Sequence, residues 1–545
     1  MKRSALIALL CVFLAFTASD IVSRAIFERL PHLEDEFAYL YQARLFARGD
    51  AYIETPAPVR AYWQPFLINL EGKRFGKYTP GWPLILAAGV EMGELWVINA
   101  WLSMLTVAVV YRLGREVYNP QTGAVAALLT AISPAAMLLS GSLMAHTLAL
   151  FLTTLFLYAL WRIERGRRVL LWGAIGGAAL GLNVLARPMT AIAIAVPFVI
   201  YSVGRVGWRF VRRSPREGWR TLRPLLVLGV IASAISLYWP VFNYTVTARP
   251  GESFPHYLVR FARGDEDTNL YLYIWDYDKI GFGEGHGRVK GGHTLEIGWR
   301  HAKKDLNCAS RDLLGWARAA PDQVDIVKNP CAENGRGYSW VVIVAGLLLT
   351  LRKRWTWLFL ALIVSLIAFY LAYWIGGNLY SARYYSEALT AATLLAAAGI
   401  AGLAHWLEAG LRRINAPGAR AGRRIVYGAL AVLAVYTLAI YAPARLRPLT
   451  GYGRISQGQI EQVNRLRQDP DRPVVVIVWG EHHWRDIGAL MAVTDPYLDS
   501  EIVLARDPDQ RYLDTLRARW SDREQLFFFD GRLSRTPPET VATAE

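Results

Sequence analysis

Two adjacent carboxylates, Asp35 and Glu36, stand at the head of an apolar segment near the N-terminus. The apolar side chains of this segment share one helical stripe, formed by Leu33, Phe37, Leu40, Tyr41 and Leu45. A carboxylate at such a place can act as a general base. It can equally cap the first turn of a helix and complement the helix dipole. Position alone leaves both interpretations open.

Four further residues could complete a reaction centre with the acidic pair. They are Lys77, Arg187, Arg383 and Tyr384, each close to the end of an apolar run. A carboxylate base together with several cationic side chains is suited to a reaction in which a sugar is transferred from a lipid phosphate to a hydroxyl group. The base accepts the proton of the attacking hydroxyl, and Arg and Lys donors neutralise the departing phosphate. With these cations a divalent metal is optional and not indicated, so we expect no cofactor to be required.

The elements that must position these groups are membrane helices. Of the 545 residues, 54% are hydrophobic, which is uncommon in a soluble protein of this length. There are 60 Lys and Arg against 44 Asp and Glu, a formal net charge of +16. These basic residues cluster in short segments between apolar runs and form no zinc-finger or helix-turn-helix pattern. The composition therefore predicts a polytopic membrane protein in contact with lipids, and no nucleic-acid partner.

About eleven runs are long and apolar enough to cross a membrane. They begin near residues 5, 95, 121, 142, 169, 188, 225, 338, 355, 385 and 424. The first is interpreted as a retained span and not as a cleaved signal peptide, because the acidic helix follows it so closely. The segment 80–90 is short and interrupted by proline, so it either leads into the second span or re-enters the membrane.

The basic segments fix the sidedness of these spans. Basic residues open the chain and follow every even-numbered span, which places all of these segments in the cytoplasm. The opposite ends then face outward: loop 28–79, a turn near residue 140, a turn near Arg187, loop 244–337, the turn 376–384 and the tail 443–545. The acidic pair and the cations named above fall on this outward side.

Residues 1–443 are predicted to form the transmembrane domain, and residues 444–545 a small α/β domain outside the cytoplasm. The tail contains three strand-like apolar runs, "RPVVVIVWG", "EIVLARD" and "QLFFFDG", separated by helical patterns. Its "EHHW" motif (481–484) follows the first strand, where α/β domains often place ligand contacts. A surface histidine pair is the commoner explanation of such a motif.

Two weaker signals lie in loop 244–337. His286 and His293 belong to a glycine-rich stretch whose histidine spacing is no metal signature. We expect this stretch to shape the donor or acceptor pocket, in the manner of a lid. Cys308 and Cys331 either form a disulfide or remain two free thiols.

Four short motifs, "EDEFAYLYQARLFARGD", "GKYTPGWPLIL", "ARP" and "SARYYSEAL", together resemble the type C glycosyltransferase superfamily. They are most similar to bacterial members related to protein O-mannosyltransferases and the lipid A aminoarabinose transferase. The resemblance covers roughly residues 1–410 and rests on the order and sidedness of the motifs. It implies a mainly α, polytopic fold with interfacial helices in the first outward loop.

The resemblance also implies roles for individual residues. Asp35 would be the base, and Glu36 its partner or a group that orients the acceptor. Lys77, Arg383 and Tyr384 would lie near the donor phosphate. The resemblance supports such a role less strongly for Arg187.

The chain departs from the family at one place. Many relatives carry a second acid near the start of the fourth span, where this chain has "SGSLMAHTLAL" with His146 as its only ionisable side chain. Either His146 assists on the acceptor side or it is an ordinary histidine at a helix end.

The sequence therefore predicts an inverting glycosyltransferase of the bacterial plasma membrane. It would move a hexosyl or pentosyl group from a polyprenyl-phosphate sugar donor to a glycan, lipid or protein acceptor. A transporter or flippase of a lipid-linked glycan remains an alternative, as does a glycan polymerase or ligase, which loop 244–337 partly fits. The acidic pair at a helix head, without internal repeats or charges in mid-span, favours the transferase.

Overall fold

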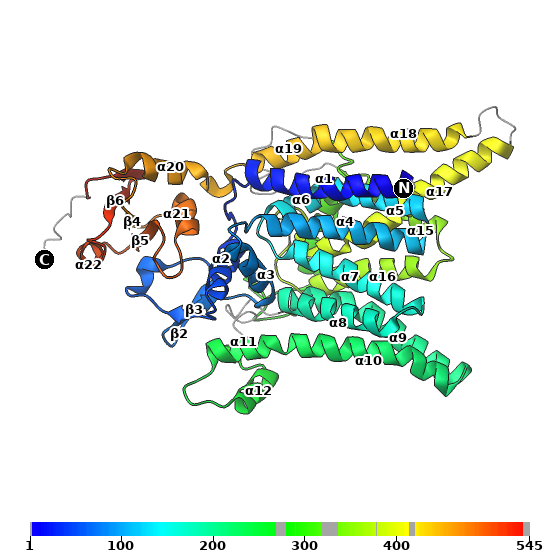
Figure 1. Ribbon diagram of the computed structural model, residues 1–545, viewed down its shortest axis with the longest axis horizontal. Coiled ribbons are helices and arrows are strands. Elements are labelled where there is room, and N and C mark those ends of the chain that lie inside the picture. Colours follow the sequence, from blue (N-terminus) through cyan, green and yellow to red (C-terminus); the bar gives the residue numbers. More distant parts are fainter. Residues whose placement is uncertain are drawn as a thin grey trace.

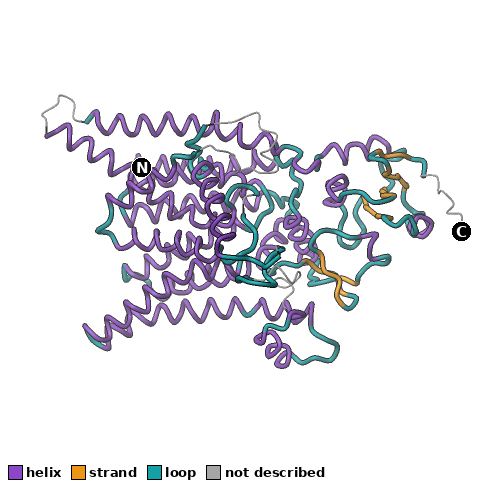
Figure 2. The backbone as a smooth tube through the Cα atoms, turned by 180° about the vertical axis from the view of Figure 1, so that it is seen from behind, coloured by secondary structure: helices purple, strands orange, loops and turns teal. Residues whose placement is uncertain are grey.

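The computed structural model describes residues 3–268, 280–288, 290–318, 336–377, 379–413 and 420–537. In this part of the chain a long bundle of helices carries a smaller unit of strands and short helices at one end (Figures 1 and 2). The mainly α fold predicted from the sequence is confirmed.

Eight helices of the described residues are long and apolar enough to cross a membrane, by length and composition. They comprise α1 (Arg3–Ala25), α4 (Val97–Val117), α7 (His146–Glu164), α8 (Val169–Ala186), α9 (Pro188–Arg212), α10 (Pro215–Ser236) with α11 (Tyr238–Thr247), the 3₁₀ helix η5 (Arg383–Ala388) with α17 (Leu389–Arg413), and the helix that begins with α18 (Ala421–Tyr436). A helix lies at each of the predicted positions, but the count of about eleven spans is not confirmed.

The remaining predicted spans are short or bent. Helices α15 (Ser339–Leu349) and α16 (Arg354–Tyr370) are apolar but shorter than the other spans. Helices α5 (Pro120–Ala131) and α6 (Pro134–Gly141) meet at an angle of 54°. The break falls at Pro134, which lacks an N–H, and the Ser133 side chain caps the new helix by accepting from the Ala136 N–H at 3.4 Å.

Glycines allow α15 and α17 to pack with their backbones in contact. A Cβ on Gly399 would lie 2.2 Å from the carbonyl oxygen of Val342, and one on Gly346 would lie 1.8 Å from the carbonyl oxygen of Leu395. Small residues at such crossings are typical of helix packing within a membrane.

The substitution Gly399→Ala is expected to destabilise this crossing by about 1–3 kcal/mol, because the added methyl group meets a backbone atom that cannot rotate away. Thermal unfolding of the purified protein in detergent measures the effect. Gly410 lies on the same helix with open space around it, so Gly410→Ala is the matched control and should leave the melting temperature unchanged or slightly higher. Equal melting temperatures for the two variants would contradict the packing argument.

The segments predicted to face outward gather at one end of the bundle, on the left in Figure 1. Helix α2 (Glu34–Ala47) lies there, followed by an antiparallel sheet of order β1-β3-β2. Its strands are β1 (Ile53–Glu54), β2 (Leu67–Leu70) and β3 (Lys73–Gly76), and the 3₁₀ helix η1 (Val59–Tyr62) lies between the first two. Segment 80–90 forms the short helix α3 (Gly81–Glu91), whose buried Trp82 donates to the carbonyl of Leu143 at 2.7 Å.

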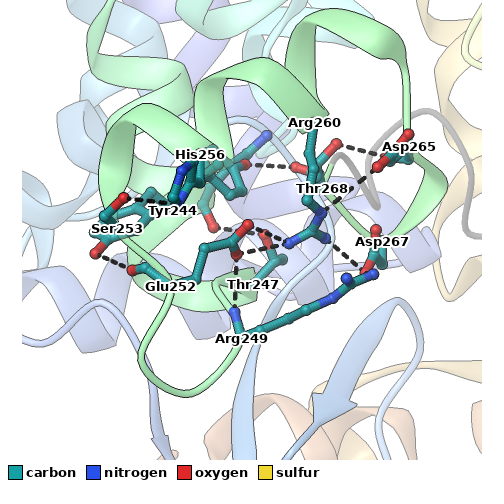
Figure 3. Close-up of polar contacts among 12 residues, drawn as sticks. Tyr244, Thr247, Arg249, Glu252, Ser253, His256, Arg260, Asp265, Asp267 and Thr268 are labelled. Carbon is teal, nitrogen blue, oxygen red and sulfur yellow. Dashed lines mark hydrogen bonds and ion pairs between the residues drawn. The ribbon is translucent and has the colours of Figure 1, made fainter.

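A polar network closes the connection that follows α11 (Figure 3). Arg260, in α12 (Phe254–Arg263), donates from Nη1 to both carboxylate oxygens of Glu252 at 2.6 and 2.7 Å. Its Nη2 lies 2.6 Å from a carboxylate oxygen of Asp267. These ion pairs fix α12 beside the end of α11. Lys73 of β3 also donates to the carbonyl of Thr245 at 3.0 Å, so the small sheet is tied to the same helix.

The C-terminal unit is the α/β arrangement that the tail pattern predicts. Its sheet has the order β5-β4-β6-β7, with β4 parallel to β5 and β6 and with β7 antiparallel to β6. The elements are α20 (Gln457–Leu466), β4 (Val474–Trp479), the 3₁₀ helix η9 (Trp484–Ile487), α21 (Gly488–Val493), β5 (Ile502–Asp507), α22 (Leu513–Arg519), β6 (Glu524–Phe529) and β7 (Arg532–Ser534). The five residues Val474 to Val478 are fully buried, as the continuous apolar run requires.

This unit packs directly on α2. Arg44 donates to the carbonyl of Thr494 at 3.0 Å, and Arg48 forms an ion pair with Asp499 at 2.7 Å. His32, just before the helix, meets the carbonyl of Ile455 at 3.1 Å. Helix α2 is therefore held between the bundle and the C-terminal unit.

Candidate active site

A cavity of about 110 Å³ opens at the head of α2, where the helix meets the bundle. Six of the residues singled out in the sequence line it: Asp35, Lys77, His146, Arg187, Arg383 and Tyr384. These residues are separated by as many as about 350 positions in the sequence, so the fold alone brings them together. Glu36, His286 and His293 lie outside the lining.

Asp35 presents its carboxylate to this cavity. It lies in the first turn of α2, where Glu34 adds negative charge beside the positive end of the helix dipole. Tyr78 donates a hydrogen bond to Asp35 Oδ1, and Arg383 Nη1 lies 3.6 Å from Asp35 Oδ2. The side chain is 20% exposed, so a substrate hydroxyl can reach it.

Glu36 turns the other way and is buried. Its Oε2 accepts from the backbone N–H groups of His32 at 2.6 Å and Leu33 at 3.1 Å, and its Oε1 accepts from that of Leu143 at 3.0 Å. Burial raises the pKa of Glu36 to about 7, against the opposing effect of these donors. Since all three contacts are to backbone, Glu36 anchors the start of α2 to the connection between α6 and α7, and in doing so it orients Asp35.

Arg187 lies between α8 and α9 and already has an anionic partner. Its Nε is 3.1 Å from an oxygen of Glu387, a residue whose side chain is fully buried. Its Nη2 donates to the hydroxyl of Tyr370 at 3.0 Å, and its Nη1 meets Nε2 of His146. The charge of Arg187 is therefore largely balanced by protein groups.

Arg383 is the more available cation. Its Nε and Nη1 are buried and form no hydrogen bond with the described residues, and its guanidinium lies 5.4 Å from the ring centre of Tyr384. The preceding residues Tyr380 and Ser381 adopt positive φ values of 55° and 69°. Two consecutive residues of this kind store backbone strain, which a fold tolerates where the turn has a specific purpose. Here the turn directs Arg383 toward Asp35.

Aromatic rings form the remaining wall of the cavity. Tyr384 stacks on Tyr370 with ring centres 4.8 Å apart and an angle of 4° between the rings. Tyr39 packs against Tyr78 at 4.6 Å, and the ammonium group of Lys77 also lies near Tyr78, at 5.5 Å from its ring centre. Such rings offer flat faces for a sugar and hydroxyl groups for hydrogen bonds.

Asp305 is a buried acid near this site that no sequence motif marks. It lies on α14 (Leu295–Asp312) and accepts from the backbone N–H of Gly377 at 3.0 Å. Gly377 in turn accepts from the backbone N–H of Arg383 at 2.8 Å. Asp305 therefore positions the strained turn, and burial raises its pKa to about 6.

This raised pKa makes part of the stability depend on pH. The folded protein holds a proton on Asp305 over a range in which the unfolded chain, with an aspartate pKa of about 3.9, has released it. The free energy of unfolding should therefore decrease as the pH rises from about 4 to about 6, by up to about 3 kcal/mol. Asp305→Asn keeps an acceptor for Gly377 and should remove this part of the dependence.

Melting temperatures measured from pH 4 to pH 8 test the expectation. The matched control is Asp514→Asn on the surface of α22, which should follow the wild-type profile. If Asp305→Asn also follows the wild-type profile, Asp305 does not titrate in this range.

His286, His293 and Cys308 of the outward loop are absent from the lining of the cavity. His293 is buried, stacks on Phe282 at 5.4 Å and meets the carbonyl of Leu371 at 2.8 Å. No group of three metal-ligating side chains occurs within the described ranges. Cys308 is disulfide-bonded, and the predicted partner, Cys331, lies outside the described residues.

A second, apolar cavity of about 250 Å³ lies next to the first. The two share His146, and Leu150, Leu306 and Ile367 are among the apolar residues that line the second. A polar cavity with an apolar neighbour can accommodate a molecule that has a charged head and a hydrocarbon chain.

Comparisons with known proteins agree with this architecture. Residues 83–239 match the family described as dolichyl-phosphate-mannose-protein mannosyltransferase. ArnT from Cupriavidus metallidurans in the apo state is 16% identical, with a TM-score of 0.53 over 96% of this chain and 93% of that one. The chain has a type C glycosyltransferase fold.

The structure of the same ArnT bound to undecaprenyl phosphate is also similar, at 15% identity and a TM-score of 0.53, over 96% of this chain and 92% of that one. None of the curated proteins matches the chain in sequence. The resemblance predicted from the motifs is confirmed, as is a polytopic membrane fold of the type C kind. The match to ArnT extends into the C-terminal unit, whereas the motifs end at about residue 410.

Proposed function

We propose that this protein is a glycosyltransferase that moves a sugar from a polyprenyl phosphate to an acceptor hydroxyl. The observation that carries the proposal is the pairing in one cavity of an accessible carboxylate, Asp35, with a buried, incompletely bonded guanidinium, Arg383. The fold shared with ArnT, together with the family match of residues 83–239, supports this assignment.

In the proposed reaction the acceptor hydroxyl attacks C1 of the sugar. Asp35 takes the proton at Oδ2, because Oδ1 is already bonded by Tyr78. The bond between C1 and the phosphate oxygen breaks, and the electron pair leaves with the lipid phosphate. Attack from the face opposite to the phosphate inverts the anomeric centre.

Arg383 and Lys77 would neutralise the departing phosphate. The Nε and Nη1 of Arg383 make no hydrogen bond with the described residues, although Nη1 forms an ion pair with Asp35 at 3.6 Å, and both Arg383 and Lys77 line the cavity. Phosphate needs little protonation to leave, so electrostatic stabilisation by these cations is the main requirement. We propose that no divalent metal is needed, and transfer should persist in the presence of EDTA.

The adjacent apolar cavity would receive the first part of the polyprenyl chain. It lies among the bundle helices, and His146 belongs to the lining of both cavities. The complex of ArnT with undecaprenyl phosphate makes a polyprenyl carrier the first candidate. We place the cavity on the outer side of the bacterial plasma membrane, as the distribution of basic loops predicts.

Sugar transfer by the purified protein in nanodiscs tests the proposal. A panel of radiolabelled polyprenyl-phosphate hexoses and pentoses is supplied together with lipid, glycan and protein fractions of a bacterial envelope. Label should move to an acceptor, with inversion at C1. If instead the intact labelled lipid crosses the membrane of a proteoliposome and no bond is cleaved, the protein is a flippase and the proposal is wrong.

A further inference from the structure

The C-terminal unit contains a hollow of about 600 Å³ that shares no lining residue with the two cavities described above. It lies where β4 and β5 end, and residues of and just after η1 close it from the side. Its lining includes Arg60, Trp63, Glu481, His482, Trp484 and Arg506. The sequence marked only the "EHHW" motif among them.

The place of the hollow in the fold is typical of a ligand site. Strands β4 and β5 are parallel and end side by side, with Trp479 opposite Asp507. Gly480 follows with a positive φ of 82°, so the chain turns sharply and carries the next residues over the strand ends. Ligands of α/β domains commonly bind outside the carboxyl ends of parallel strands.

The hollow holds a cation that no carboxylate of the described residues contacts directly, although the charge of Glu481 in the same lining acts on it. Arg506 is 9% exposed, and within the described residues it makes no ion pair and its Nε makes no hydrogen bond. Its Nη2 donates to the carbonyl of His482 at 3.3 Å. Arg60 differs, since it lies 2.6 Å from Asp509 and 3.7 Å from Glu481. A buried guanidinium at the wall of a hollow, with no carboxylate of the described residues in direct contact, favours an anionic ligand.

Two indole rings give the hollow its second property. The ring of Trp63 lies 5.3 Å from the guanidinium carbon of Arg506 and is 39% exposed. Trp484 lines another part of the wall. Flat aromatic faces next to hydrogen-bonding groups suit the C–H faces and hydroxyls of a sugar ring. The guanidinium of Arg506 beside the ring of Trp63 indicates a carbohydrate that carries carboxylate or phosphate.

The hollow adjoins the helix that bears Asp35. Trp484 packs on Phe37 of α2 with ring centres 5.4 Å apart, and Arg485 forms an ion pair with Glu34 at 3.5 Å. Glu34 is the residue before Asp35. A ligand held in the hollow would therefore contact Trp484, which packs on the helix that carries the proposed base.

We propose that this hollow binds the anionic carbohydrate part of the acceptor and holds the acceptor beside the catalytic cavity. This inference rests on the proposed glycosyltransferase function in one respect, namely that the bound carbohydrate is the acceptor of the transferred sugar. Binding of an anionic carbohydrate can be measured without any transfer, so the two proposals can fail separately.

Titration calorimetry with the full chain in nanodiscs tests the binding. The probes are an oligogalacturonide, which carries carboxylates, a phosphorylated oligosaccharide, and neutral maltotriose. At least one anionic probe should bind and maltotriose should not. The probe that binds identifies the anionic group, and inorganic phosphate alone should bind more weakly than the phosphorylated sugar.

Variants locate the binding. Arg506→Gln and Trp63→Ala should each weaken binding at least tenfold with unchanged melting temperature. The matched control Arg532→Gln replaces an exposed arginine on β7 and should bind like wild type. If Arg506→Gln loses stability, Trp63→Ala serves as the independent test. If neither anionic probe binds, or if both variants bind like the control, the proposal is overturned.

Transfer assays separate this proposal from the preceding one. Both variants should raise KM for the acceptor and leave KM for the donor unchanged. If both variants transfer normally with an unchanged acceptor KM, the hollow takes no part in the reaction, and the glycosyltransferase assignment still stands. Binding of an anionic probe without transfer of any sugar would support the hollow as a site for anionic carbohydrate and would contradict the glycosyltransferase assignment.

Discussion

Replacing Asp35 by asparagine is expected to lower kcat for sugar transfer by about a hundredfold to ten-thousandfold. Asparagine keeps the size of the side chain and can still accept from Tyr78, but it cannot take the proton of the acceptor hydroxyl. KM for the donor should change little, because Arg383 and Lys77 remain. Steady-state transfer from the donor identified in the panel measures both constants.

The control for this variant is Glu34→Gln. Glu34 lies in the same first turn of α2 and is not part of the cavity lining, so this change removes one charge from the helix head without removing the base. Transfer by Glu34→Gln should be close to wild type, and both variants should melt as wild type does. If Asp35→Asn also transfers normally, Asp35 only caps the helix and the base lies elsewhere.

Much of the bundle could be predicted from the sequence because each span carries its own signal. An apolar run of sufficient length is a local property, and a helix lies at every predicted position. The number of spans depends less on local sequence. Pro134 breaks the third run into two helices, while α15 and α16 are too short to qualify by length. Only packing against neighbouring helices decides whether such pieces cross the membrane.

The candidate site was predictable only in part. Asp35 and Arg383 stand in recognisable motifs, and the structure brings them within 3.6 Å of one another. The direction in which Glu36 points depends on backbone donors that include Leu143, more than a hundred residues away. The partnership of Arg187 with Glu387 and the support that Asp305 gives to the turn are tertiary in the same sense, and no spacing in the sequence marks them.

The hollow in the C-terminal unit was also predictable from the sequence only in part. The "EHHW" motif is correctly placed after a strand, but its histidines do not explain the site. The informative residues are Arg506 from the next strand and Trp63 from the first outward loop, which meet only after the C-terminal unit has packed on that loop.

The second large effect is expected for Arg383. The variant Arg383→Gln should lower kcat/KM for the donor by roughly a hundredfold to a thousandfold, because it removes the available cation that meets the developing charge on the phosphate. Arg383→Lys should recover part of this loss, since it restores the charge but not the planar pair of donors. Binding of the product polyprenyl phosphate, measured by calorimetry, should weaken in the same order.

A matched control for Arg383 exists on α14. Arg300 is exposed and pairs with Glu296 at 3.3 Å, so Arg300→Gln changes the net charge on the same side of the bundle without touching the cavity. If kcat falls in Arg383→Gln while product binding is unchanged, Arg383 acts only on the transition state. If neither quantity changes, Lys77 and Arg187 must hold the phosphate, and the ion pair between Arg187 and Glu387 must then open when the donor binds.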